Sequence, residues 1–107
     1  MTEIQLLEFT KGEVRNLSGH ERGLAARVTF DLETLDVIPE PVDVVVPDDL
    51  DAISTSFFQG MFARSVQRFG SRDNFLQHYR FHAGPHLMLQ IQRGIDAVQT
   101  RRKAALA

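Results

Sequence analysis

The segment from Val42 to Phe58 constrains the fold more than any other part of the chain. Residues Val42–Val46 form a short β-branched run, which is typical of a strand with neighbours on both sides. Pro47 ends this strand, because proline cannot donate a ladder hydrogen bond. An acidic loop follows, and three hydroxyl residues then stand where a helix should begin. A strand, a loop and a helix in this order predict an α/β arrangement.

The residues after this hydroxyl cluster predict a helix from Thr55 to Phe69. Its apolar residues recur at helical spacing and give the helix one apolar side. Gly70 follows, and glycine is the usual residue just beyond a helix C-terminus. The apolar side comprises Phe57, Phe58, Met61, Phe62, Val66 and Phe69.

The first 17 residues predict a hairpin. Residues 4–9 alternate as in a strand, and Thr10–Gly12 is a suitable turn in which Gly12 can take a positive φ. Residues 13–17 then pair back as a short second strand.

A helix is predicted next, from Gly19 to Leu35. Ser18 and Glu21 have the spacing of a capping box, in which each side chain accepts from the other residue's backbone N–H. The expected apolar stripe of this helix comprises Leu24, Val28, Leu32 and Leu35.

The last third of the chain predicts a strand and a helix. Residues 71–77 fit either a short helix or an irregular connection. His78–His82 alternates as a strand with its two aromatic residues inward, and Pro85 is favourable at the start of a helix that runs to about Arg101. Gly94 inside that helix costs about 1 kcal/mol relative to alanine, so we expect a close packing contact there. The core stripe of the helix comprises Leu87, Ile91, Ile95 and Val98.

The order of these elements predicts a single α/β domain over residues 1–107, with a core from 3 to 98 and a basic helix end at 99–107. We expect a four- or five-stranded, mixed or mostly parallel sheet covered by three or four helices. The predicted core includes Phe58, Phe62, Val44, Val46, Leu24, Val28, Ile91 and Ile95.

Composition excludes several classes of protein. The chain has no cysteine, so disulfides and thiolate metal sites are excluded. No apolar run approaches the length of a membrane span, and the N-terminus lacks the pattern of a signal peptide. The basic run Arg101–Lys103 is too short to indicate nucleic-acid binding. We therefore expect a cytoplasmic protein that binds neither nucleic acid nor membrane.

Charge is distributed unevenly along the chain. Residues 28–63 contain no lysine or arginine, and basic residues predominate from Arg64 onward. One interpretation is a set of solvated faces that keep a small domain soluble. The other is an acidic rim that faces a basic partner. The acidic residues of the segment are Asp31, Glu33, Asp36, Glu40, Asp43, Asp48, Asp49 and Asp51.

Ser54, Thr55 and Ser56 are the main candidate site residues. Any one of them can cap the helix that begins here, and capping explains one hydroxyl. A phosphate on one of them would be favoured by the helix dipole. It would also add about −1.5 to −2 charges beside the acidic loop, which makes the cluster a candidate switch. The loop contributes Asp48, Asp49 and Asp51 to the same candidate site.

Other chemistries have weaker support. His78, His82 and His86 are spaced by four, but Gly84 and Pro85 interrupt any helix that would bring all three to a metal. The loop carboxylates suit a divalent cation, but no EF-hand or phosphate-loop pattern accompanies them. No nucleophile motif surrounds Ser54. We expect no enzymatic activity, no metal and no cofactor.

The segment Ile53–Phe58, together with the strand before it, resembles the STAS-like domain family of unknown function. That family places isoleucine, two or three serines and phenylalanine after its central strand. The segment is more distantly similar to the anti-sigma factor antagonists of the STAS superfamily. In that similarity Ser54 stands at an aspartate, Thr55 at the phosphorylated serine and Ser56 at the second serine.

The resemblance implies a STAS-like fold and a regulatory role in protein–protein interaction without enzymatic activity. It implies a partner of the ATPase-like kinase or anti-sigma class, and it leaves a homodimer open. The rival hypothesis is a small-ligand or anion-binding module that uses the N–H groups at the same helix start.

Overall fold

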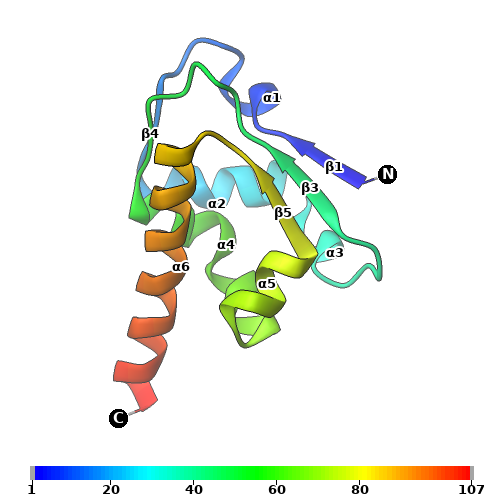
Figure 1. The fold of residues 1–107 in the computed structure, drawn as a ribbon, viewed down its shortest axis with the longest axis vertical. Helices are drawn as coiled ribbons and strands as arrows, with labels where there is room; N and C mark the ends of the chain where they lie inside the picture. Colours follow the sequence, from blue (N-terminus) through cyan, green and yellow to red (C-terminus); the bar gives the residue numbers. More distant parts are fainter. Residues whose placement is uncertain (1, 107) are drawn as a thin grey trace.

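The structure is a computed structural model that describes residues 2–106, with side chains described for residues 2–100. A three-stranded sheet has the order β1-β3-β5, and both of its strand pairs are parallel. Helix α4 packs against both α2 and α6, and the three helices lie on one side of the sheet (Figure 1). The strands are β1 (Thr2–Gln5), β3 (Val42–Val45) and β5 (Tyr79–His82), and the helices are α2 (His20–Thr29), α4 (Thr55–Phe69) and α6 (Pro85–Leu106).

Helices cover only one face of this sheet. Ile4, Val44 and Tyr79 point inward and are buried. Glu3 and Arg80, which flank the central strand on the other face, are exposed. Parallel sheets normally have both faces covered, so the open face is a distinctive feature of the molecule.

The predicted α/β class is confirmed. The prediction of a single four- or five-stranded sheet was wrong, because the strands divide between a three-stranded and a two-stranded sheet. Within residues 2–106, two short strands, β2 (Asn16–Leu17) and β4 (Ala52–Ile53), pair in parallel as a second sheet. Three further helices raise the number in this range to six: α1 (Leu7–Thr10), α3 (Leu32–Leu35) and α5 (Arg72–His78).

The predicted N-terminal hairpin was also wrong. After β1 the chain turns into the single helical turn α1, and β2 pairs with β4 instead of β1. Lys11 and Gly12 have positive φ angles of 56° and 71°, and the Lys11 N–H donates to the Leu7 carbonyl oxygen. These left-handed residues end the turn of helix, so they do not close a hairpin.

The predicted helix from Gly19 to Leu35 is divided in two. The left-handed backbone of Asp31, with φ at 52°, separates α2 from α3. Gly19 is the N-cap of α2 and no side chain caps it, so the predicted capping box does not form.

The buried side of α2 also differs from the predicted stripe. Leu24 and Val28 are 43% and 80% exposed, whereas Gly23 and Ala26 are buried. A Cβ built on Gly23 would lie 2.2 Å from the Phe57 carbonyl oxygen and 2.9 Å from the Gly60 Cα. The α2 and α4 backbones therefore meet at their glycines, and this contact turns the larger apolar residues outward.

The remaining elements follow the sequence closely. Helix α4 has the predicted bounds and ends at Gly70, which is left-handed. Residues 71–77, left open above, lie largely in α5, and the Ser71 hydroxyl caps that helix. A Cβ on Gly94 would lie 2.5 Å from the ring of Phe58, so the predicted close contact is confirmed. Predicted core residues that are buried are Phe58, Phe62, Val44, Val46, Ile91 and Ile95.

Candidate functional site

The start of α4 is capped by Ser54 alone. The Ser54 Oγ accepts from the Phe57 N–H at 3.1 Å, and the Ser54 carbonyl oxygen accepts from the Phe58 N–H at 3.0 Å. Thr55 and Ser56 occupy the first turn of the helix and are exposed. The Ser56 Oγ lies 3.1 Å from the Ser54 Oγ. One hydroxyl therefore caps the helix, and the other two remain at the surface.

We expect Ser54→Ala to lower the free energy of unfolding by about 1 kcal/mol, because it removes this cap. Thr55→Ala should change stability by less than about half of that, since Thr55 does not cap. Urea denaturation of both variants provides the measurement. Equal losses in the two variants would contradict this assignment of the cap.

The acidic loop before α4 is anchored at Asp51. The Asp51 carboxylate accepts from Arg15 Nε at 2.9 Å and from its Nη2 at 3.3 Å, and the Asp51 N–H donates to the Arg15 carbonyl oxygen at 2.7 Å. The hydrogen bond from Arg15 lowers the pKa of Asp51, and the same bond raises the pKa of Arg15. Asp48 and Asp49 are exposed and form no ion pair within residues 2–100.

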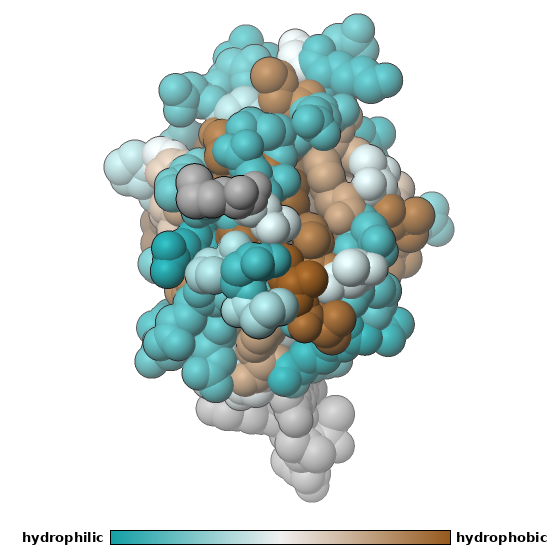
Figure 2. Space-filling view, turned by 90° about the vertical axis from the view of Figure 1, so that its right-hand side faces the viewer, coloured by the Kyte–Doolittle hydropathy of each residue, from teal (hydrophilic) through white to brown (hydrophobic). Residues whose placement is uncertain are grey.

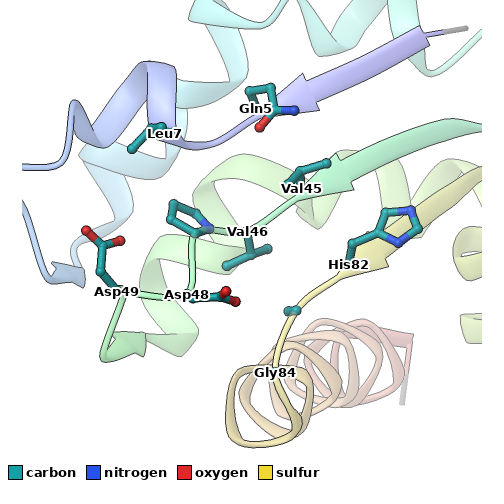
Figure 3. Close-up of a pocket in the computed structure, with 10 residues that line it drawn as sticks. Gln5, Leu7, Val45, Val46, Asp48, Asp49, His82 and Gly84 are labelled. Atoms are coloured by element: carbon teal, nitrogen blue, oxygen red, sulfur yellow. The ribbon is translucent and has the colours of Figure 1, made fainter.

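An open pocket of about 900 Å³ lies where the three parallel strands end. In open α/β sheets, ligands bind outside the carboxyl ends of the strands where the strand order reverses, and the order β1-β3-β5 has no such reversal. Figure 3 shows the strand ends and the loops after β3 and β5 around this pocket. The structure therefore brings Asp48 and Asp49 to the pocket, while Ser54, Thr55, Ser56 and Asp51 lie outside its lining. The lining comprises Gln5, Leu7, Val45, Val46, Pro47, Asp48, Asp49, His82, Ala83 and Gly84.

The three histidines do not come together. The His78 Nε2 contacts the Leu35 carbonyl oxygen at 2.6 Å, and the His82 Nε2 pairs with Asp43 at 2.8 Å. The His86 Nε2 lies 3.2 Å from the Asp51 carbonyl oxygen. Within residues 2–100 no group of three potential ligands gathers around a point that could hold a metal ion.

A buried polar cluster around Asp36 was not predicted from the sequence. The Asp36 carboxylate, which is fully buried, accepts from the Arg27 Nη2 at 2.7 Å and from the Ser65 hydroxyl at 2.6 Å. The Tyr79 hydroxyl also donates to it, and burial, followed by this hydrogen bond, raises the pKa of Tyr79. Arg68 Nη1 donates at 3.0 Å. The cluster joins α2, α3, α4 and β5, and its donors leave Asp36 no free oxygen for substrate chemistry.

The exposed apolar residues of α2 form a second feature that the sequence did not indicate. Leu24 and Val28 lie beside α4 and line a hollow of about 320 Å³, together with the charged residues Arg27, Asp31, Glu33 and Arg64. The Leu24 N is 2.9 Å from a Cβ built on Gly60, which is about one and a half helical turns from Thr55. The two apolar side chains therefore lie beside the middle of α4, in a hollow whose other lining residues are charged.

Comparison with known proteins does not assign the chain to a family. No protein-family model matches the chain, and no curated protein or solved structure is significantly similar to it. The STAS-like resemblance of Ile53–Phe58 stays a prediction. None of the helices in residues 2–106 combines the length and the apolar content required to cross a membrane.

Proposed function

We propose that this chain is a regulatory protein-interaction domain, controlled by phosphorylation at the start of α4. The observation that supports this proposal most directly is that only one of the three hydroxyls caps the helix. Ser54 caps the helix, and Thr55 and Ser56 remain exposed without that duty. A kinase can reach both hydroxyls, and modification of Thr55 leaves the Ser54 cap and its contact with Ser56 in place.

The expected effect of a phosphate follows from charge. At Thr55 it would meet the positive end of the α4 dipole, so the helix itself would tolerate it. It would also add about −1.5 to −2 charges to a surface whose preceding loop already carries Asp48, Asp49 and Asp51. A partner that tolerates the acidic loop but no further negative charge would be repelled, while the fold persists.

The neighbouring surface on α2 supports a protein partner. Leu24 and Val28 offer apolar contact area beside α4, and the charged residues around them offer polar contacts to the same partner. The resemblance of Ile53–Phe58 to the STAS-like family points in the same direction. It suggests a partner of the ATPase-like kinase or anti-sigma class and no catalytic role for this chain.

The test uses Thr55→Glu against Thr100→Glu, which adds the same charge at an exposed position near the far end of α6. Affinity capture from the source cells, quantified by mass spectrometry, should recover a protein with wild type and Thr100→Glu. Recovery should fall at least tenfold with Thr55→Glu. Equal recovery by all three, with no phosphate at residues 54–56 of the endogenous protein, would refute the switch.

The rival proposal, an anion site on the same helix start, has less support. The Ser54 Oγ already accepts the Phe57 N–H, so an anion would have to displace it. Stabilisation of the isolated chain by millimolar phosphate, lost in Thr55→Pro but retained in Thr100→Ala, would favour the anion site instead.

A further inference from the structure

We infer that the open pocket at the carboxyl edge of the β1-β3-β5 sheet receives a basic, partly apolar segment of a partner protein. This inference depends on the proposed function in one respect, namely that the binding partner is a protein. The site is separate from the hydroxyl cluster, because none of Ser54, Thr55 and Ser56 lines the pocket.

The apolar part of the pocket comes from three elements. Leu7 follows β1 and is 49% exposed, Val45 ends β3, and Pro47 begins the acidic loop (Figure 3). Val45 lies on the face of the sheet that no helix covers, so its side chain is only half-buried. These side chains can cover the aliphatic part of a ligand.

The charge of the pocket is acidic. Asp48 and Asp49 are its only acidic lining residues, and neither forms an ion pair within residues 2–100. His82, the one lining residue that can become cationic, is already directed to Asp43 at 2.8 Å. Asp49 lies within electrostatic reach of Arg15, but neither carboxylate is ion-paired there, so the pocket favours a cationic occupant.

The two carboxylates point in different directions. In Figure 3 the Asp48 side chain extends toward Gly84, where α6 begins, and the Asp49 side chain extends toward Leu7. The positive end of the α6 dipole stabilises a carboxylate placed near it. The arrangement fits two basic groups on one extended segment better than it fits a single compact cation.

The shape of the pocket also favours a protein segment. A small ligand usually buries 70–90% of its surface, whereas this pocket is a broad hollow open to solvent. A bound segment can continue along the open sheet face beyond the pocket. Figure 2 shows the side of the molecule around the N-terminus, away from the pocket, where hydrophilic and apolar residues are interspersed. At the pocket itself, the carboxylates and the apolar lining residues would select the occupant.

The test is an NMR titration of the isotopically labelled chain with the acetylated and amidated tetrapeptide Leu-Arg-Leu-Lys. Backbone amides of Val46, Asp48, Asp49 and Gly84 should shift and saturate. The double substitution Asp48→Asn with Asp49→Asn should weaken binding at least tenfold. The control Glu40→Gln with Asp73→Asn removes the same charge from exposed residues outside the pocket, and it should leave affinity within twofold.

Three results would overturn the inference: equal weakening in the control, equal shifts with the acidic peptide Leu-Glu-Leu-Glu, or equally tight saturation of these amides by agmatine. The last would make the pocket a small-cation site. The titration uses neither a phosphate nor the cellular partner. Its failure therefore leaves the Thr55 experiment intact, and failure of the Thr55 experiment leaves the titration intact.

Discussion

Gly60→Ala is expected to lower the free energy of unfolding by about 3 kcal/mol, the upper end of the usual cost of overpacking. In an ordinary helix interior the same change stabilises by roughly 0.5–1 kcal/mol. The expected sign is reversed here because the new Cβ would lie 2.2 Å from the His20 carbonyl oxygen and 2.9 Å from the Leu24 N. Both are backbone atoms, so relief requires α2 and α4 to move apart.

Gly84→Ala provides the matched control, because a Cβ there meets no atom within 4 Å and φ is not positive. A loss of about 3 kcal/mol corresponds to a fall of roughly 12–24 °C in Tm for a domain of this size. Thermal and urea unfolding should show that fall for Gly60→Ala and little change for Gly84→Ala. An unchanged or raised Tm in Gly60→Ala would contradict the close crossing of the two helices.

The glycine contact also explains which parts of the fold could be predicted from the sequence. Strand β3 and helix α4 follow from local patterns: a β-branched run, helical apolar spacing and a terminal glycine. The face of α2 is decided instead by backbone contact with Gly60, 37 positions after Gly23 in the chain. The spacing of apolar residues along the chain does not reveal such a contact between distant residues. A prediction from that spacing therefore placed Leu24 and Val28 in the core.

Part of the candidate site could likewise be predicted from the sequence, and part could not. A cap among Ser54, Thr55 and Ser56 follows from residue type and position, but only the backbone geometry selects Ser54. The pocket requires the spatial order of the strands. β3 lies between β1 and β5, which brings the loop after β3 beside the ends of its two neighbours.

One segment, which includes β4, connects the pocket at the strand ends with the hydroxyl cluster at the start of α4. It runs from Pro47 at the pocket to Ser54 at the α4 cap, and Arg15 holds it through both the side chain and the N–H of Asp51. The Ile53 N–H is held by the Gln90 side chain at 2.7 Å. A phosphate at Thr55 and a basic segment in the pocket would therefore act on the two ends of one anchored segment, with charges of opposite sign.

Asp36→Ala is expected to lower the free energy of unfolding by about 3–5 kcal/mol, the range seen when one partner of a buried ion pair is removed. Arg27, with a side chain only 6% exposed, would lose its shorter carboxylate contact and keep Glu33 at 3.2 Å. The Ser65 and Tyr79 hydroxyls would lose their acceptor as well. Urea unfolding measures the loss.

Asp73→Ala, on the exposed side of α5, is the control and should change stability by less than about 0.5 kcal/mol. The double variant Arg27→Met with Asp36→Leu should be more stable than Asp36→Ala, because an apolar pair leaves no uncompensated buried charge. A loss below about 1 kcal/mol in Asp36→Ala would show that Glu33 alone suffices for Arg27. Asp36 would then not be the residue that holds α2, α3, α4 and β5 together.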